Sequence, residues 1–264
     1  MESISSRHNP IVRAFRALAH GRSHDGLLLD GARLVEDALA SGARVTTAAV
    51  SHALLSRAGG ADRLVAALEA SGAHVVAVPP GVMAVMSPVH TPSGVVAIAQ
   101  RSPVPLDAAF AASPQLTLIL DHLQDPGNVG AVIRTADAAG ATGLVACGDT
   151  ADPFGWKALR GAMGSTFRLP VVARAAATDA VAAARDRGLR ILAAAPRGGR
   201  SMYDSDLTGP IAILMGGEGA GLPDETAGLA DDRVTIPMRE PVESLNVAVS
   251  AALILYEAHR QRQR

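Results

Sequence analysis

An arginine on a predicted helix is the first residue of this chain that ordinary packing does not explain. The turn Asp125-Pro126-Gly127 leads to Asn128 at the head of the helix, and Arg134 follows two turns later. Asn128 suits a helix N-cap, and the turn is ordinary turn chemistry. Val132 and Ile133 are apolar and should face the core, so the neighbouring guanidinium needs a carboxylate or phosphate partner unless it is simply solvated. Arg134 is therefore a candidate functional residue.

A glycine-rich loop indicates a second kind of chemistry, the binding of a nucleotide-like ligand. The segment Gly216-Gly217-Glu218-Gly219-Ala220-Gly221 follows a predicted strand at residues 211–215. Glycines after a parallel strand let a ligand approach backbone amides closely. Dinucleotide binding is the natural rival interpretation, but its glycine fingerprint normally opens the first strand–helix unit. This loop comes late in the chain and is followed by Pro223.

The third segment joins a predicted strand to a long predicted helix. Ile236-Pro237-Met238 is expected to be a strand that ends in an extended turn, and Glu243-Ser244-Leu245-Asn246 to begin the helix. Ser244 is the candidate cap, and the simplest interpretation is that Ser244 and Asn246 satisfy the backbone at the helix start. Asn246 is expected inside the first helical turn, however, where capping alone would not explain an asparagine.

Hydrophobic periodicity divides the chain into two parts. In the first part we expect helices at residues 10–18, 32–40 and 61–70 and strands at 45–50, 74–78 and 95–99. In the second part we expect strands at 116–120, 143–147, 190–194 and 211–215 and helices at 129–139, 154–163, 178–186 and 245–260, with the alanine-rich run 173–184 also helical. Short apolar strands separated by helices predict an α/β fold whose parallel sheet is covered on both faces.

Two prolines mark the predicted domain boundary. Pro103 and Pro105 favour an extended connector after the last strand of the first part. A chain of 264 residues can hold two modest domains, each with a core of its own. The prediction is a smaller α/β domain at residues 1–100, a linker at 101–110 and a parallel-sheet domain at 111–264.

Composition excludes several classes of protein. Hydrophobic residues make up 48% of the chain, yet no apolar run approaches the roughly 20 residues that a membrane span needs, and the N-terminus is polar. We therefore expect no membrane segment and no export signal. The single cysteine, Cys147, can build neither a disulfide nor a cysteine metal site within one chain, which favours a reducing cytoplasm. No metal is expected, because no His/Asp/Glu cluster has ligand-like spacing.

Charge distribution matters more than the net charge of −1, which argues against a uniformly basic nucleic-acid binder. Both ends of the chain are locally basic, which suits contacts to phosphates. The candidate RNA contacts are Arg7, Arg13, Arg16 and Arg22 near the N-terminus, with Arg260, Arg262 and Arg264 at the C-terminus. With 3% aromatic residues there is little for unpaired bases to stack on, so a stacking platform of the single-strand-binding type is disfavoured.

The three polar segments, in this order and spacing, resemble the motifs of the SpoU (TrmH-type) RNA ribose methyltransferases of the SPOUT superfamily. The resemblance covers about residues 116–264. It implies an α/β fold with a deep trefoil knot, a homodimer, and transfer of a methyl group from S-adenosylmethionine to a ribose 2'-hydroxyl of RNA. Residues 1–100, with Asn9-Pro10 and the segment 30–36, resemble the ribosomal-protein-like substrate-binding domain that often precedes such a domain.

The same resemblance implies roles for individual residues. It places the methyl donor at Gly216, Gly221, Ile236, Met238 and Leu245, and assigns catalysis and orientation to Arg134, Asn128, Glu218, Ser244 and Asn246. The matching arginine of the family is often taken as a general base, but a guanidinium with a pKa above about 12 accepts protons reluctantly. We prefer the hypothesis that Arg134 holds the target phosphate and stabilises developing negative charge.

Several functions remain open. The separate N-terminal domain favours large-subunit ribosomal RNA as the target. The alternatives are a tRNA ribose methyltransferase, a ribosomal RNA methylase that gives antibiotic self-resistance, a non-catalytic RNA-binding relative and a nucleotide-dependent oxidoreductase. The chain departs from the family at Glu240, followed by Pro241, where a glycine is common. Because a side chain tolerates positive φ poorly, we expect this loop to take another shape.

Overall fold

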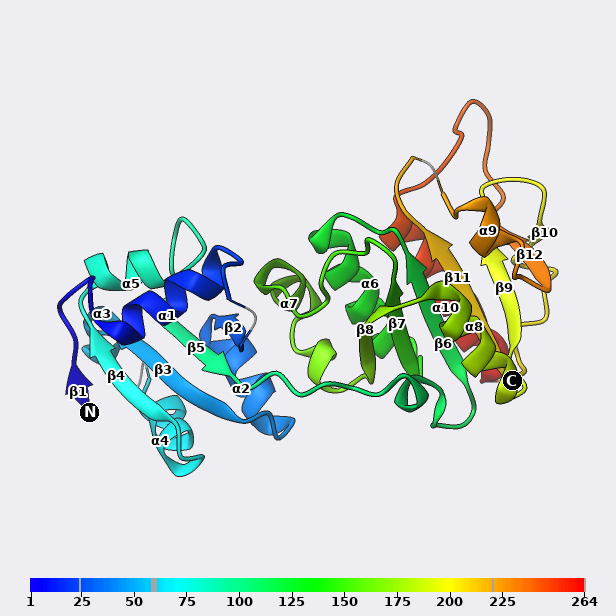
Figure 1. Cartoon of the computed structure of the whole chain (residues 1–264). Helices are drawn as coiled ribbons and strands as arrows, with labels where there is room; N and C mark the ends of the chain where they lie inside the picture. The colour runs from blue at the N-terminus through cyan, green and yellow to red at the C-terminus, as the bar shows by residue number, and fades with distance from the viewer. Residues whose placement is uncertain (24, 58–60, 220, 264) are drawn as a thin grey trace. The chain divides into compact units, whose positions relative to one another are not determined.

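A computed structural model of the chain describes residues 1–23, 25–57, 61–219 and 221–263, and these form two compact units (Figure 1). The first unit comprises residues 1–102 and 154–167, and the second comprises residues 103–153 and 168–264. Ala220 of the glycine-rich loop and Arg264 lie outside the described residues.

The first unit is built on a mixed sheet that, in the described residues, has five strands. These are β1 (Glu2–Ser3), β2 (Leu27–Asp30), β3 (Val45–Ser51), β4 (His74–Val78) and β5 (Val95–Ala99), in the order β1-β4-β3-β5-β2. β1, β4 and β3 pair in parallel, whereas β5 runs antiparallel to both of its neighbours, β3 and β2.

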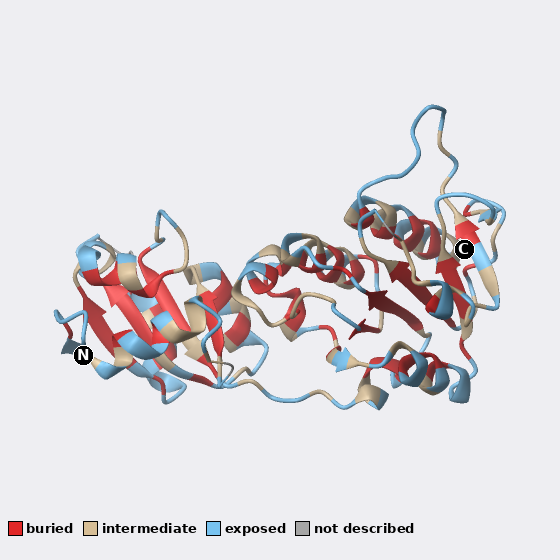
Figure 2. Ribbon diagram, turned by 45° about the horizontal axis from the view of Figure 1, so that its top comes forward, coloured by how far each residue is buried: buried red, intermediate tan, exposed pale blue. Residues whose placement is uncertain are grey.

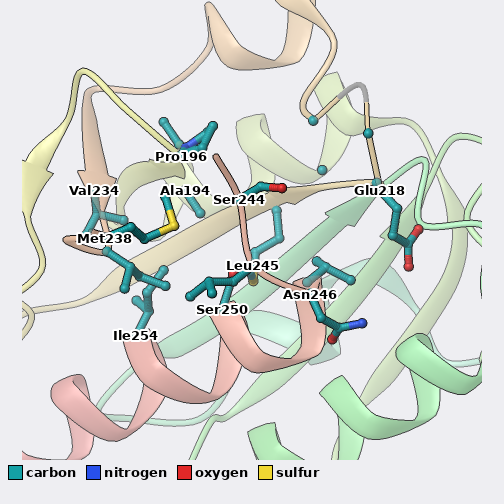
Figure 3. A pocket seen from close by; sticks show the side chains of 18 residues that line it. Ala194, Pro196, Glu218, Val234, Met238, Ser244, Leu245, Asn246, Ser250 and Ile254 are labelled. Atoms are coloured by element: carbon teal, nitrogen blue, oxygen red, sulfur yellow. The ribbon is translucent and has the colours of Figure 1, made fainter. Parts of the chain in front are cut away.

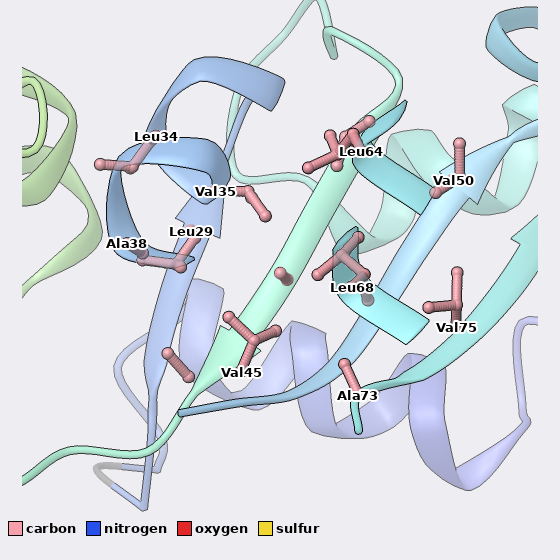
Figure 4. Close-up of a cluster of buried hydrophobic side chains, with 14 of the residues drawn as sticks. Leu29, Leu34, Val35, Ala38, Val45, Val50, Leu64, Leu68, Ala73 and Val75 are labelled. Carbon is pink, nitrogen blue, oxygen red and sulfur yellow. The ribbon is translucent and has the colours of Figure 1, made fainter. Parts of the chain in front are cut away.

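Helices cover both faces of this sheet. They are α1 (Pro10–Ala19), α2 (Ala32–Ala40), α3 (His52–Leu55), α4 (Asp62–Ala70), α5 (Pro80–Met86) and α7 (Trp156–Ala162), followed by the 3-10 turn η2 (Ser165–Phe167). Successive strand residues point to opposite faces, as the strand period of two requires. Leu29 and Val75 join the core under α2 and α4 (Figure 4), while Leu28 and Val76 join the core under α1 and α5.

One segment of the first unit comes from far along the chain. The sequence assigned residues 154–163 to the second domain, but α7 packs against β2, and its Leu159 is fully buried in the core that holds Leu29. Arg160 of α7 lies near Asp30. Burial raises the pKa of Asp30, and a 2.5 Å hydrogen bond from Ser87 and the charge of Arg160 oppose this shift. The domain boundaries expected from the sequence, at residues 100 and 110, stay a prediction.

The second unit confirms the predicted α/β fold with a parallel sheet. Its strands are β6 (Leu116–Asp121), β7 (Gly143–Cys147), β8 (Val171–Ala175), β9 (Arg190–Ala194), β10 (Arg200–Ser201), β11 (Ile211–Gly216) and β12 (Asp232–Thr235). The order is β10-β12-β9-β11-β6-β7-β8, and each described pair of neighbours runs in parallel. The central strands β6, β7, β9 and β11 are almost continuously buried (Figure 2), as expected of a parallel sheet with helices on both faces.

Two helical layers sandwich this sheet. The helical elements are η1 (Leu106–Phe110), α6 (Pro126–Ala138), α8 (Ala177–Asp186), α9 (Asp224–Ala227) and α10 (Val247–Arg262). η1 and α8 share one core with alternate residues of the strands, such as Ile119 and Val145. α10 packs against α6 and contacts β11.

Two sequence predictions in this unit are wrong. Residues 173–184 do not form one helix, because β8 extends to Ala175 and pairs with β7; membership of a sheet overrides the helix propensity of alanine. Arg260 and Arg262 are not free for phosphate. Arg260 pairs with the buried Glu257, and Arg262 donates hydrogen bonds to the carbonyl oxygens of Leu207, Gln115 and Gly209.

Candidate functional site

The carboxyl ends of the parallel strands meet at one edge of the second unit's sheet. From β6 the chain moves outward to β7 and β8, and then crosses to the other side to form β9, β11 and β12. The order therefore reverses between β6 and β11, and such a switch point is where open α/β sheets bind ligands. The loops that follow β6 and β11 contain the first two polar segments of the sequence.

A cavity of about 340 Å³ opens at this edge (Figure 3). It is formed by the ends of β9, β11 and β12 and by the first turns of α10. The donor residues implied by the family resemblance all line it: Gly216, Gly221, Ile236, Met238 and Leu245. Glu218, Ser244 and Asn246 line it too, so two of the three sequence segments meet around one cavity.

The sequence analysis missed part of the wall. Ala194 ends β9, Ala195 and Pro196 follow it, and Val234, Ser250 and Ile254 come from β12 and α10. The sequence predicts a strand at residues 190–194. Because the carboxyl ends of parallel strands share one edge of the sheet, the end of this strand could have been expected near the site. Small and apolar residues carry no chemical pattern of their own, which is why these six were not singled out.

A chain of side-chain hydrogen bonds joins the three sequence segments at the mouth of the cavity. The Asn128 amide donates to the Glu218 carboxylate, and the Asn246 amide donates to Asn128 Oδ1 at 3.1 Å. Asn246 Oδ1 in turn accepts the backbone N–H groups of Ala248, at 2.9 Å, and Val249, at 3.3 Å. Residues 90 and 118 positions apart are thereby held together.

The caps of two helices differ from the predicted ones. Asp125, not Asn128, caps α6, with its carboxylate accepting the Asn128 N–H at 2.7 Å. Asn246, not Ser244, caps α10, so it stands just before the first turn rather than inside it. Both shifts have the same cause, because each side chain can accept backbone N–H groups two or three residues on. The side chain of Asn128 is thereby free for Glu218 and Asn246.

Close backbone packing explains the first glycine of the loop. A side chain at Gly216 would overlap the backbone of Gly221 and Leu222, because the loop folds back on itself through a bridge between Gly217 and Gly221. Gly219 and Gly221 have φ of +87° and +70°, in the region that favours glycine. The described glycines of this loop therefore present backbone to the cavity.

The buried carboxylate of Asp121 fixes the end of β6. It accepts a 2.6 Å hydrogen bond from Thr226 of α9 and lies 2.9 Å from Nδ1 of His122.

Burial, together with the charges of Asp121 and Asp179, raises the pKa of the nearby Cys147 thiol to about 12. Since the thiolate is the reactive form, Cys147 is inert near neutral pH.

The remaining predicted residues are exposed. Arg134 lies on α6 beside the buried Val132 and Ile133, and no hydrogen bond or ion pair links its side chain to another described residue. In the first unit, Arg7, Arg13, Arg16 and Arg22 are exposed as well. In the described ranges no helix could cross a membrane, and no group of three or more His, Cys, Asp or Glu is arranged to hold a metal.

The loop that departs from the family pattern does not need a glycine. The non-glycine residues with positive φ in the described part of the chain are His122, Met163 and Arg174. Glu240 therefore stands outside the left-handed region and is exposed. The backbone cost expected for a side chain at this position is absent from the described loop.

Comparisons with known proteins cover both units. The family model of the SpoU rRNA methylase family matches residues 115–256, and that of the MRM3-like substrate binding domain matches residues 9–97. An uncharacterized tRNA/rRNA methyltransferase of Synechocystis is 35% identical over 98% of this chain and 94% of its own length. The 23S rRNA (guanosine(2553)-2'-O)-methyltransferase RlmP of Bacillus subtilis is 30% identical over 97% of this chain and 98% of its own.

A solved structure has the same fold throughout. The AdoMet-bound rRNA methyltransferase from Sinorhizobium meliloti matches with a TM-score of 0.87 and 32% identity, over 98% of this chain and 97% of that chain. Fold, cavity and matches together define an S-adenosylmethionine-dependent RNA methyltransferase. More particularly, the chain belongs to the SpoU rRNA methylase family, with an MRM3-like substrate-binding domain before the catalytic one. The oxidoreductase interpretation of the glycine loop is therefore set aside.

Gly216→Ala should weaken binding of S-adenosylmethionine by roughly tenfold or more, because overpacking of this kind costs about 1–3 kcal/mol and displaces the loop that lines the cavity. Isothermal titration calorimetry measures this directly. Gly209→Ala is the matched control, since a Cβ at Gly209 meets no atom within 4 Å. Unchanged donor affinity in a folded Gly216→Ala protein would contradict the assignment of this loop.

Proposed function

We propose that this protein transfers a methyl group from S-adenosylmethionine to the 2'-hydroxyl of a ribose in large-subunit ribosomal RNA. The observation that carries the proposal is the hydrogen-bond chain from Glu218 through Asn128 to Asn246. This chain of bonds lies at the mouth of the donor cavity, where it joins the three segments. The five residues expected at the donor line that cavity.

The cavity suits the donor chemically. Its walls combine apolar side chains, such as Ile236, Met238 and Leu245, with backbone of the loop at residues 216–221. Apolar walls with a few directed polar groups are typical of nucleotide-sized ligand sites. When bound, S-adenosylmethionine supplies an electrophilic methyl group on a sulfonium. We assign its adenosyl part to Gly216, Ile236 and Leu245, with Gly221 and Met238 beside them.

The protein's own task is to prepare the ribose oxygen. A hydroxyl is a poor nucleophile until its proton leaves, so the site must orient it and stabilise the developing negative charge. Arg134 is on the same helix as Asn128, about 9 Å further along its axis, and its guanidinium has no partner among the described residues. We assign it to the phosphate of the target nucleotide, where it lowers the energy of the oxyanion. The proton passes to that phosphate or to water.

The orienting residues act through one another. In our assignment, the hydrogen bond from Asn128 holds the carboxylate of Glu218 at the mouth of the cavity, and Asn246 fixes the start of α10. Ser244 lines the same cavity from the segment before α10. Ribosomal RNA is favoured as the target because the RlmP relative, named for 23S rRNA, aligns along nearly the whole of both chains.

Transfer of label from methyl-tritiated S-adenosylmethionine tests the reaction. We expect label in unmodified bacterial 23S rRNA, recovered as alkali-resistant dinucleotides because a 2'-O-methyl group removes the nucleophile of alkaline cleavage. Unmodified tRNA serves as the comparison substrate. Label in tRNA alone would mean that tRNA, and not ribosomal RNA, is the substrate. Donor binding without label in either RNA would favour the alternative of a non-catalytic RNA-binding protein.

Arg134→Ala should lower kcat/KM by about 10²–10³-fold, the usual cost of removing one group that stabilises an oxyanion. Arg134→Lys should retain measurable activity, because it keeps the positive charge while losing the planar fork of N–H donors of the guanidinium. Arg233→Ala, an exposed arginine of the same unit, is the control. Full activity in Arg134→Ala would exclude a catalytic role, and a Lys variant as inactive as Ala would indicate that the fork or a base role is essential.

We further propose a trefoil knot, a homodimer and a cytoplasmic location. The segment 236–246 and the loop at 216–221 line one cavity, which supports a knotted C-terminal part. An apolar stripe supports the dimer: Val249, Leu253 and Tyr256 recur every three or four residues along α10 and are 38–51% exposed. Such a stripe on a helix can pack against its own copy about a twofold axis.

Leu253→Glu combined with Tyr256→Asp should convert the dimer to a monomer, since two carboxylates would be buried without partners in the interface. Size-exclusion chromatography with light scattering measures the mass. Tyr203→Asp is the control, because Tyr203 is 62% exposed and lies outside α10. A wild-type chain that is monomeric at micromolar concentration would refute the homodimer.

A further inference from the structure

A second cavity, of about 180 Å³, lies in the first unit. It opens beside the carboxyl ends of β3 and β4, between α3, α5 and the loop that leads into β5. Its wall is largely apolar, with Leu54, Met83 and Pro92 facing the space. Nothing in the reaction proposed above uses it.

The polar groups of this second cavity are hydrogen-bond donors. Ser51 and Ser93 contribute hydroxyls, Arg57 contributes a guanidinium, and no acidic residue is among the described residues of the wall. The Ser51 hydroxyl accepts the Leu54 N–H at 3.2 Å, and its own proton has no described acceptor. The Arg57 side chain is exposed and forms no ion pair with a described residue. A ligand with carbonyl or phosphate oxygens suits such a wall.

Further positive charge lies beside the cavity. The Arg7 guanidinium is 3.5 Å from where a side chain at Gly81 would begin, next to Pro80 of the cavity wall. α1, which carries Arg13 and Arg16 on its exposed side, packs against α5, whose Met83 and Ala84 line the cavity (Figure 1). Arginines thus extend from the cavity along the adjacent helix, as a phosphate backbone would require.

Size narrows the choice of ligand. Sites for drug-sized ligands occupy about 300–1,000 Å³, so this cavity is too small for a whole nucleotide cofactor but can hold one planar heterocycle. Proteins that read RNA commonly take up single unpaired bases between apolar or planar side chains and bond their edges. A thioether such as that of Met83 adapts well to an aromatic face.

We infer that this cavity binds one unpaired base of the RNA substrate, with Arg57 and Arg7 on the flanking phosphates. The inference rests on the proposed function, because it gives the substrate-binding domain a second contact besides its exposed arginines. It accounts for an open, largely apolar site in a protein with few aromatic residues: one base packs against aliphatic walls instead of being stacked on a ring.

The test separates the base from the phosphates. The probes are fluorescein-labelled RNA octamers in which tetrahydrofuran residues replace all eight bases, or all but one central A, C, G or U. Anisotropy at fixed low salt gives the affinity of the full-length protein for each. For wild type we expect at least one base to raise affinity by roughly tenfold over the base-free backbone, the size of one base contact.

Variants place the base in the cavity. Ala84→Phe fills the mouth and should abolish the gain from the single base, whereas Arg57→Ala should weaken binding of every probe, the base-free backbone included. The matched controls are Ala67→Phe and Arg63→Ala on α4, which packs on the other face of the sheet and whose residues 63 and 67 are exposed. Both controls should keep the full gain. The far-UV circular dichroism spectrum should be unchanged in all four proteins, which verifies that they are folded.

Three results would overturn the inference: no base raises wild-type affinity, the gain survives Ala84→Phe, or Arg57→Ala costs no more than Arg63→Ala. Because the readout is binding and not methyl transfer, it does not depend on the reaction. A chain that fails to methylate any RNA but shows a cavity-dependent gain would refute the proposed function and leave the base site standing.

Discussion

The arrangement of the catalytic unit depends on the fact that a carboxylate can only accept hydrogen bonds. Because Glu218 accepts, Asn128 must present its NH₂ group to it, and Asn128 Oδ1 then faces Asn246. Asn246 in turn must donate to Asn128, so its own oxygen is left for the free N–H groups of α10. The donor and the acceptor of each hydrogen bond are therefore fixed, from the Glu218 carboxylate to the start of α10. Each amide orientation is fixed by its neighbour.

The sheet makes this chain of bonds possible. β6 and β11 are adjacent parallel strands in register from Leu116–Ile211 to Asp121–Gly216, so the two loops leave the sheet at the same level. α10 is held at both ends, by Asn246 at its start and by the three carbonyl contacts of Arg262 at its finish. The polar termini thus fix a helix whose middle packs on α6. Arg262, which looked like a phosphate contact from its charge, serves this purpose instead.

Patterns that depend on one residue's chemistry could be predicted from the sequence, whereas those that depend on neighbours could not. Strands such as β7 and β9 were placed to the residue, because an apolar run between turns has one solution in a parallel sheet. Polar residues in unusual places marked the site. The caps were misplaced by two or three residues because Asp125 and Asn128, or Ser244 and Asn246, have nearly equal capping chemistry and only the tertiary partner decides between them. β8 was missed because alanine carries no strand signal, and residues 194–196 because their contribution is shape.

The return of residues 154–167 to the first unit bears on how the protein is made. Leu159 completes a core whose other members lie before residue 102, so a ribosome that has released only the N-terminal segment has released an unfinished core. Domains usually fold in order as they emerge. Here the core of the earlier unit is complete only once residues 154–167 have been synthesised, after β6 and β7 of the later unit. The two units are therefore interleaved in the order of synthesis, and neither corresponds to an uninterrupted stretch of the gene.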